Sequence, residues 1–261
     1  MNQQFEHILF EQIGPVGKIT LNRPEMRNAI TTAMAQEVNV ALMAAKQDES
    51  VRVLVLTGAG DSFCSGLDLQ EYYRTTAFKL RAFTDALYHD MTDILYRLNK
   101  PIIAAMNGPT IGAGNSFAFA CDMIIASDTA RIIYSEINRA LVPALHTIIL
   151  PRLIGRYKAM EFLMTGDAVD IREAERLGMV NKVVAREKLE AEVMELANRL
   201  AEKSAIAMRL TREAVYRGLD VEYRKAIADA GDLCALVATS EDTKEGMKAF
   251  SEKRDPVWKG R

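Results

Sequence analysis

The sequence has few of the features that mark disulfide-rich, zinc-binding, nucleic-acid-binding or membrane proteins. Its three cysteines lie far apart, with no CxxC pair and no histidine at zinc-ligand spacing, so neither a disulfide framework nor a metal site is expected. Thirty-three Lys and Arg against thirty-five Asp and Glu give a formal net charge of -2, which leaves no overall basic field for a nucleic acid or an anionic membrane. No run reaches the ~18 apolar residues of a membrane helix, and no basic leader precedes an apolar run at the N-terminus. We therefore expect reduced thiols, a cytoplasmic location, and no nucleic-acid, membrane or metal partner.

What the sequence does contain is the composition and strand–helix alternation of an α/β globular protein. Of its 261 residues, 49% are hydrophobic and 26% charged, and the length is close to the ~250–300 residues at which a single core stops growing. β-branched runs stopped by glycines indicate buried strands, and these alternate with helices over the first ~150 residues. Beyond Val184 every run has helical periodicity. These patterns predict a core over residues 1–184 and a helical lobe packed on it over residues 185–261.

Local signals place several elements within that core. Gly14 lies between two apolar runs and predicts a hairpin over residues 7–21. Thr31 is a suitable N-cap for a helix that follows it, and helical spacing predicts a second helix over residues 78–98. Continuous apolar runs at residues 51–57 and 102–106 indicate buried strands.

Two glycine-bearing turns follow these strands and could expose backbone N–H groups. The first is DSFCSGLDL, residues 61–69, and the second is GPTIGAGNS, residues 108–116. Small residues let a ligand approach the main chain, and two N–H groups that converge on one oxygen would form an oxyanion hole. Either loop, taken alone, is better explained as a tight turn.

Glu136 is a candidate proton carrier. It lies among Ile132, Ile133, Ile137 and Leu141, which would remove water from its carboxylate and raise the pKa of that group. The alternative is a solvated carboxylate at the end of a strand.

Four segments, taken in order, resemble the enoyl-CoA hydratase/isomerase (crotonase) superfamily. They are LNRPEMRNAI, VLTGAGDSFCSGLDL, KPIIAAMNGPTIGAGNSFAFACD and SEDTKEGMKAFSEKR. The resemblance covers nearly the whole chain and implies an α/β spiral of ββα units with C-terminal helices that mediate assembly into a homotrimer or homohexamer. It also implies an acyl-CoA substrate, with coenzyme A as part of the substrate and no separate cofactor.

The same resemblance assigns catalytic roles. The thioester carbonyl would be held between the backbone N–H groups of Leu67 and Ala113. Hydratases of this superfamily use two glutamates, and here the first position holds Ser116 while the second aligns with Glu136. A serine hydroxyl cannot act as a carboxylate base near neutral pH. A single glutamate fits Δ3,Δ2-enoyl-CoA isomerisation, in which one base takes a proton from C2 and returns it at C4.

Further residues are candidates for substrate contact. His146 could be a second acid or base, could narrow the acyl pocket, or could be a core histidine, and Tyr134 could donate a hydrogen bond to an intermediate. Arg27 and Lys253 match positions of basic contacts to the CoA phosphates, with Lys253 serving a neighbouring subunit. The remaining substrate-binding candidates are Ala29, in the LNRPEMRNAI segment, and Ser65, Asp68 and Leu69, in the first turn.

Three other functions stay open from the sequence. Ser116 could orient a water for Glu136, which would preserve enoyl-CoA hydration. His146 or Tyr134 could serve a hydrolase acting on a thioester or a carbon–carbon bond, or a decarboxylase, in the same framework. Loss of the first glutamate could also leave an inactive CoA-binding homologue. The acyl-chain length cannot be read from residues 71–90.

Overall fold

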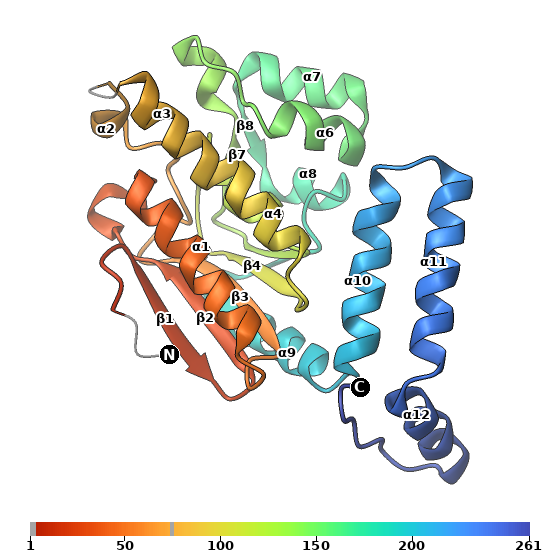
Figure 1. Cartoon of the computed structure of the whole chain (residues 1–261). Helices are drawn as coiled ribbons and strands as arrows, with labels where there is room; N and C mark the ends of the chain where they lie inside the picture. The colour runs from red at the N-terminus through yellow and green to blue at the C-terminus, as the bar shows by residue number, and fades with distance from the viewer. Residues whose placement is uncertain (1–3, 74–75) are drawn as a thin grey trace.

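The core is built around two β-sheets, shown in the computed structural model of Figure 1, which describes residues 4–73 and 76–261. Residues 1–3, which begin the N-terminal segment where no leader is expected, lie outside the described residues. The larger sheet has six strands in the order β1 (Ile8–Ile13), β2 (Val16–Leu21), β3 (Val53–Gly58), β4 (Ile102–Met106), β6 (Met123–Ser127) and β9 (Lys182–Val184). The smaller has the order β5 (Thr110–Ile111), β7 (Arg131–Ile133) and β8 (Ala168–Asp170).

Pairing in the larger sheet follows from the connections. β1 and β2 are antiparallel and joined by a turn in which Gly14 has φ +56°, as the predicted hairpin requires. From β2 to β9 the neighbouring strands are parallel, because helical crossovers return the chain to the same edge. The carboxyl ends of β3 and β4 therefore meet at one edge, where the two glycine-bearing turns begin.

Both faces of the larger sheet are buried, and alternate residues of β3 pack on the two faces. Leu54 and Leu56 join the cluster under helix α1 (Thr32–Gln47), whereas Val53 and Val55 join the cluster under helix α9 (Leu189–Ala201). Alternate residues of a strand point to opposite faces, so a strand covered on both sides is apolar throughout. The predicted cap of α1 is present, since Thr31 Oγ1 accepts a hydrogen bond from the Met34 N–H at 3.1 Å.

The helical stretch predicted over residues 78–98 is interrupted. It consists of α3 (Ala77–Thr84), a π-helical turn (Asp85–Asp90, labelled η2 in the element order) and α4 (Met91–Tyr96). A π-turn adds one residue per turn and rotates the side chains that follow it, and such turns are frequent at functional sites. The remaining elements before β9 are the short helices η1 (Pro24–Met26), α2 (Leu69–Tyr73), α5 (Gly114–Phe119), η3 (Ser135–Arg139), α6 (His146–Ile154), α7 (Arg156–Thr165) and α8 (Ile171–Arg176).

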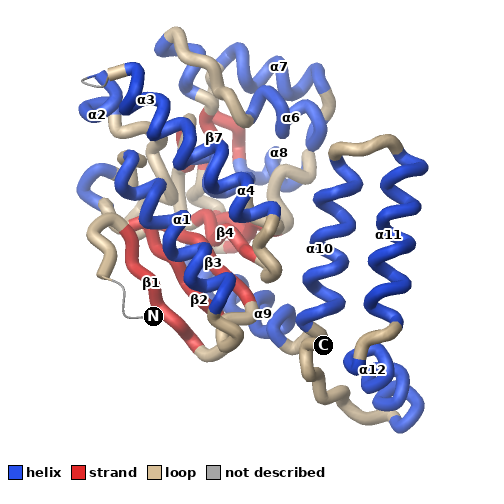
Figure 2. Tube along the Cα trace, in the orientation of Figure 1, coloured by secondary structure: helices blue, strands red, loops and turns tan. Residues whose placement is uncertain are grey.

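After β9 the described chain is helical, with η4 (Arg186–Lys188), α9, α10 (Ala205–Leu219), α11 (Tyr223–Ala238) and α12 (Glu241–Glu252). The last strand ends at Val184, but α9 packs on the sheet through Leu189, Val193 and Ala197. The helices that stand away from the core therefore begin with α10, as the tube view of Figure 2 shows.

The lobe is fastened to the core by one part-buried ion pair. Arg212 of α10 donates from Nε to both carboxylate oxygens of Asp122 at 2.9 Å and from Nη1 to the Leu98 carbonyl at 2.8 Å. Tyr216 donates to the same carboxylate at 2.7 Å. Asp122 also accepts the N–H of Ile102, the first residue of β4, at 2.9 Å.

In the described part of the chain, no helix combines the length and the apolar character that a membrane span requires. Within the same residues, no group of three or more His, Cys, Asp or Glu side chains is placed to hold a metal ion.

Candidate active site

A cleft of about 430 Å³ opens where β3 and β4 end. Ligands of α/β proteins commonly bind outside the carboxyl ends of parallel strands, because the loops that follow those strands converge there. Eight of the predicted residues line it: Arg27, Ala29, Ser65, Leu67, Asp68, Leu69, Ala113 and Glu136. Its other lining residues are Met26, Gly66, Gln70, Ile111, Gly112, Ser135, Arg139 and Leu141.

The backbone N–H of Leu67 points away from Ile30, with which its neighbours form an isolated parallel β-bridge. The Ile30 N–H donates to the Gly66 carbonyl at 2.7 Å, and the Asp68 N–H donates to the Ile30 carbonyl at 2.9 Å. In such a bridge the residue between the two bonds directs its own N–H and carbonyl to the other side. No described residue accepts a hydrogen bond from the Leu67 N–H.

Ala113 presents the second N–H. Gly112 has φ +54° and donates its own N–H to the Ile133 carbonyl at 2.8 Å, after which the chain turns into α5. The first N–H groups of a helix have no partner within the helix. The Ala113 N–H accordingly finds no acceptor among the described residues.

Gly66 brings the two turns together. Its φ is +91°, and a Cβ there would lie 2.7 Å from the Ile111 carbonyl oxygen and 3.5 Å from the Ala113 nitrogen. A side chain at this position would therefore push the turns apart. Two unpaired N–H groups, from Leu67 and Ala113, thus border one cleft from neighbouring turns.

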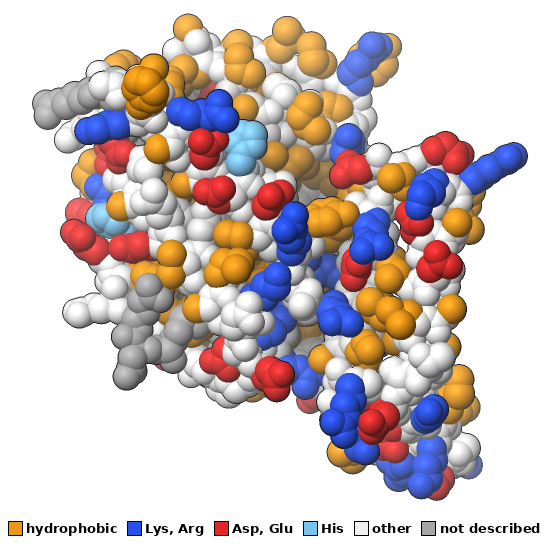
Figure 3. All heavy atoms as spheres, in the orientation of Figure 1, with side chains coloured by type: hydrophobic (Ala, Val, Ile, Leu, Met, Phe, Trp, Pro, Cys, Tyr) orange, Lys and Arg blue, Asp and Glu red, His pale blue; other side chains and the backbone are white. Residues whose placement is uncertain are grey.

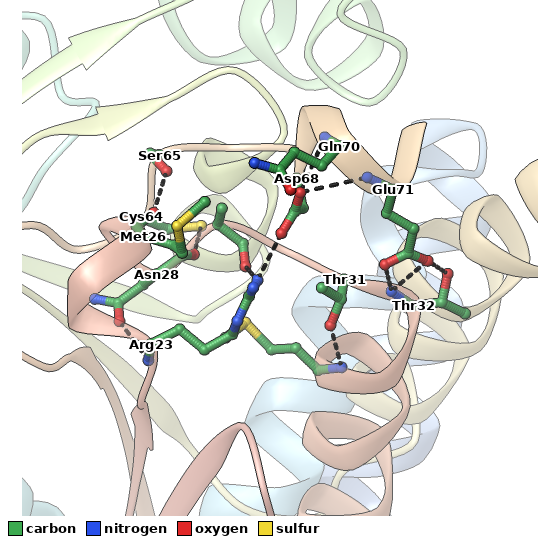
Figure 4. A network of polar contacts seen from close by, with 12 residues as sticks. Arg23, Met26, Asn28, Thr31, Thr32, Cys64, Ser65, Asp68, Gln70 and Glu71 are labelled. Atoms are coloured by element: carbon green, nitrogen blue, oxygen red, sulfur yellow. Dashed lines mark hydrogen bonds and ion pairs between the residues drawn. The ribbon is translucent and has the colours of Figure 1, made fainter. Parts of the chain in front are cut away.

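A buried amide fixes the chain that leads into the first turn, as Figure 4 shows. Asn28 is fully buried with φ +57°, accepts the Arg23 N–H at 3.0 Å and donates to the carbonyls of Ala59 and Ser62 at 2.9 Å. Asparagine tolerates this left-handed conformation better than most residues. Arg27, beside it, has φ +51° and is exposed at the cleft mouth.

Asp68, predicted to contact substrate, already has protein partners. One carboxylate oxygen accepts from Arg23 at 3.0 Å, and the other accepts the backbone N–H of Gln70 at 3.0 Å, where α2 begins. Ser65 donates to the Met26 carbonyl at 3.1 Å. Both side chains therefore shape the first turn while they line the cleft.

Glu136 lies in the short helix η3, and its carboxylate faces the second turn. A Cβ at Gly112 would lie 3.4 Å from Glu136 Oε1, so only a glycine leaves this carboxylate its full space. Burial raises the pKa of Glu136, partly opposed by a backbone hydrogen bond and by the charge of Arg139. Its Oε2 atom is buried without a hydrogen-bond partner among the described residues.

Ser116 and His146 lie deeper, below the cleft lining. Ser116 Oγ is 3.5 Å from His146 Nε2, and each residue is 1% exposed. The His146 ring centroid lies 5.0 Å from that of Tyr134 and 5.6 Å from that of Phe119. Burial lowers the pKa of His146 to about 3, so the imidazole is neutral near pH 7.

Tyr88 is a site residue that the sequence analysis missed. It lies in the π-helical turn, and its hydroxyl hydrogen bonds with Ser116. Burial, followed by the charge of Glu136, raises the pKa of Tyr88 to about 12, while Ser116 acts in the opposite sense. No motif marks this tyrosine, because in an uninterrupted helix it would be an ordinary half-buried position.

Unpaired buried atoms gather at this depth. Seven buried side-chain N or O atoms of the described residues lack a hydrogen-bond partner, and four of them belong to Asn115 (Oδ1), Tyr134 (Oη), Glu136 (Oε2) and His146 (Nδ1). Buried polar groups are normally paired, so these four atoms are exceptions that gather next to the cleft.

Lys253, a predicted CoA contact, is not among the residues that line the cleft. It ends α12, has φ +54° and is exposed. In Figure 1, α12 lies at the opposite end of the molecule from α2, which borders the cleft.

Comparison with known proteins then places the chain. A family model described as enoyl-CoA hydratase/isomerase matches residues 11–261. The chain belongs to the enoyl-CoA hydratase/isomerase family. A crotonyl-CoA hydratase of Syntrophomonas wolfei is 35% identical over 96% of this chain and 96% of its own. A short-chain-enoyl-CoA hydratase of Clostridium acetobutylicum is 32% identical over 96% of this chain and 97% of its own.

Solved structures agree with this family. An enoyl-CoA hydratase from Bacillus anthracis superposes with a TM-score of 0.94 at 34% identity, over 98% of this chain and 100% of that chain. A Geobacillus kaustophilus enoyl-CoA hydratase subunit gives 0.93 at 40% identity, over 99% of this chain and 100% of that one. These neighbours confirm the predicted crotonase-type α/β fold. The chain is thus an enzyme of the enoyl-CoA hydratase/isomerase family.

Proposed function

We propose that this enzyme catalyses Δ3,Δ2-enoyl-CoA isomerisation through a thioester enolate. The N–H groups of Leu67 and Ala113 hold the carbonyl oxygen of this enolate, and Glu136 is the single proton carrier. The observation that carries the proposal is that, of the two carboxylates lining the cleft, Asp68 is paired with Arg23 while Glu136 has an oxygen without a hydrogen-bond partner among the described residues. Glu136 lies beside the Ala113 turn, and the position of a first glutamate holds Ser116 against a neutral histidine.

The chemistry follows from these groups. The Glu136 carboxylate removes a proton from C2 of a 3-enoyl thioester, and the electron pair moves onto the carbonyl oxygen, where two N–H donors stabilise the negative charge. Reprotonation at C4 by the same carboxyl shifts the double bond to the 2,3 position. A raised pKa suits Glu136 to both steps, because it holds the abstracted proton until C4 receives it.

Enoyl-CoA hydration is the second candidate. It is favoured by the names of relatives, which are called hydratases at 32% and 35% identity. In that reaction Ser116 and Tyr88 would hold a water while Glu136 serves both as base and as proton donor. A role for His146 as general base is less favoured, because a pKa of about 3 makes it a weak base.

The test is to supply 3-enoyl-CoA and crotonyl-CoA separately to the wild-type enzyme, Ser116→Ala and Glu136→Gln. The proposal expects isomerisation to be the faster reaction, to survive in Ser116→Ala and to vanish in Glu136→Gln. Hydration that is faster than isomerisation and persists in Ser116→Ala would contradict it. Absence of C2 proton exchange with any bound acyl-CoA would instead indicate a homologue that binds CoA without turnover.

We also propose that the enzyme is a homotrimer or homohexamer, needs no cofactor beyond the CoA of its substrate, and works in the cytoplasm. The lobe supports assembly because α11 has no buried residue, while Tyr223, Ile227 and Leu236 on it are exposed. Three free cysteines fit a reducing compartment. Light scattering coupled to gel filtration tests the assembly, with a monomer as the contradicting result.

A further inference from the structure

A second hollow, here called the basic pocket, lies at the edge of the larger sheet opposite the cleft. Its volume is about 360 Å³. It is bordered by the residues that precede β3 and β4, by the end of α1, by the connection from α9 to α10 and by the C-terminal tail. The lining residues are Lys46, Glu49, Val51, Arg52, Asn99, Lys100, Pro101, Leu200, Lys203, Ala205, Ile206, Met208, Arg209, Trp258, Lys259 and Gly260.

The basic pocket and the cleft share no lining residue. The strands β3 and β4 run from the basic pocket to the cleft, and the six residues of β3 alone span about 20 Å at ~3.3 Å per residue. A ligand in one hollow therefore does not occupy the other.

The charge of the basic pocket is strongly one-sided. Its lining has one acidic residue, Glu49, against six basic ones. Only Lys259 of the six has a carboxylate partner, Glu241 at 2.9 Å. Among the ion pairs of the described residues, none includes Lys46, Arg52, Lys100, Lys203 or Arg209. Figure 3 shows Lys and Arg side chains gathered along the boundary between the core and α10.

Backbone contacts hold two of these cations in place without neutralising them. Lys100 Nζ donates to the carbonyls of Ala45 and Asp48 at 2.6 and 2.5 Å, at the C-terminal end of α1. Arg52 Nη2 donates to the Lys203 carbonyl at 2.6 Å. The helix end accounts for the position of Lys100. It leaves the charges of Arg52, Lys203 and Arg209 uncompensated.

Two further residues shape the basic pocket, one as an unpaired donor and one as a wall. Arg209 Nε is buried and has no hydrogen-bond partner among the described residues, which is costly for a guanidinium unless a partner arrives. Trp258 forms a fixed wall, since its indole N–H donates to the Glu202 carbonyl at 2.8 Å and its ring packs where a Cβ on Gly246 would lie 3.1 Å away.

We propose that the basic pocket is a second ligand site of this enzyme and binds a small molecule bearing phosphate groups. Phosphate oxygens accept the planar fork of an arginine and the point charge of a lysine, both of which the pocket offers unpaired. A diphosphate or triphosphate group would bring several negative charges to Arg52, Lys203 and Arg209, the cations that the helix end leaves uncompensated. The site is independent of the proposed isomerisation, because none of its residues lines the cleft.

The chain contains a single tryptophan, Trp258, so its fluorescence reports on this pocket. The full-length enzyme is titrated with pyrophosphate, ATP and CoA, and each affinity is checked by calorimetry. We expect pyrophosphate and ATP to change the fluorescence and to bind more weakly in 0.5 M than in 0.05 M KCl, concentrations at which the Debye length differs roughly threefold. Tighter binding of ATP than of pyrophosphate would identify a nucleotide as the natural source of the phosphates.

Variants decide whether the response comes from the basic pocket. Arg209→Ala and Lys203→Ala should each weaken pyrophosphate binding about tenfold. Arg209→Lys, which retains the charge, should weaken it less, and Lys158→Ala, far from the pocket on α7, should not change it. Turnover of acyl-CoA should stay at the wild-type level in Lys203→Ala, which also shows that the variant is folded. The proposal is overturned if neither anion binds at millimolar concentration, or if only CoA binds and the pocket variants leave its affinity unchanged.

Discussion

Ser116 Oγ lies 3.5 Å from His146 Nε2, and neither side chain carries a charge near neutral pH. By the resemblance to the family, Ser116 stands at the position of a first glutamate, so the proposed site has a hydroxyl and a neutral imidazole there and not a second carboxylate. Two carboxylates in one site raise each other's pKa by repulsion. Here burial is the main cause of the raised pKa of Glu136, and no like-charged neighbour contributes to it.

Glu136→Gln should abolish proton transfer while leaving the fold intact. Loss of a positioned general base costs about 10²–10⁴-fold in rate, so kcat should fall by that factor. Acyl-CoA binding, measured by calorimetry, should change much less. Glu195→Gln, an exposed carboxylate on α9, is the matched control and should retain full activity. Comparable turnover in Glu136→Gln would remove Glu136 from the mechanism.

The same variant should alter the pH dependence of stability. The pKa of Glu136 is raised in the folded state, so its favourable contribution is fully present at low pH and is lost as pH rises through the folded pKa. Urea unfolding at pH 4 and pH 8 should therefore show that Glu136→Gln gains stability relative to wild type at the higher pH. An equal difference at both pH values would show that the carboxyl is not perturbed by folding.

His146 should make the protein sensitive to acid. Its folded pKa of about 3 lies below the ordinary value of 6.5, so the stability it contributes is present above pH 6.5 and is lost as pH falls toward 3. Each unit of difference corresponds to about 1.4 kcal/mol. The difference in free energy of unfolding between His146→Gln and wild type should therefore shift in favour of the variant as the pH falls from 7 toward 3. Chemical-shift titration of His146 provides the direct check, and a midpoint near 6.5 would contradict the prediction.

Gly112→Ala should damage catalysis more than the fold. The new Cβ would lie 3.4 Å from Glu136 Oε1, and a left-handed non-glycine residue costs about 1–2 kcal/mol. Gly14→Ala is a matched control, because Gly14 has φ +56°, close to the +54° of Gly112, but its Cβ would meet no atom within 4 Å. We expect both variants to lose similar stability and only Gly112→Ala to lose most of its kcat. Equal kcat values for the two variants would contradict the prediction that catalysis needs a glycine at position 112.

Arg212→Ala should destabilise the attachment of the lobe. Removing one partner of a buried ion pair typically costs about 3–5 kcal/mol, and the Arg212 and Asp122 side chains are only 8% and 13% exposed. Arg152→Ala breaks an exposed pair with Asp220 and should cost less than about 1 kcal/mol. Urea denaturation of both variants gives the comparison. A similar cost for the two would mean that Asp122 finds other partners.

The parts of the site that the sequence predicted are those fixed by local chemistry. Glycines after buried strands indicated the turns of Leu67 and Ala113, and the apolar neighbours of Glu136 indicated its desolvation, in line with the raised pKa of that group. These signals depend on residues close in sequence. The donors themselves, and their use on a thioester, stay predictions until tested by catalysis.

What the sequence did not predict depends on contacts between distant segments. Tyr88 contacts Ser116 from within a π-helical turn, and nothing in residues 78–98 marks such a turn. The partner of Asp68, Arg23, is 45 residues away. Helix α9 has the amphipathic pattern of the helices after it, yet it packs on the sheet through Leu189 and Val193. Amphipathic spacing indicates which face of a helix is buried, but it does not indicate which element packs against that face.

Asp122 connects the lobe to β4, the strand that leads toward the cleft. Its carboxylate holds the first N–H of β4 at one end and Arg212 and Tyr216 of α10 at the other. The far end of β4 leads into the turn of Ala113. The start of the strand that leads to the Ala113 N–H is therefore held partly by α10, which contributes no residue to the cleft, and we expect a substitution in α10 to alter turnover without contacting the substrate.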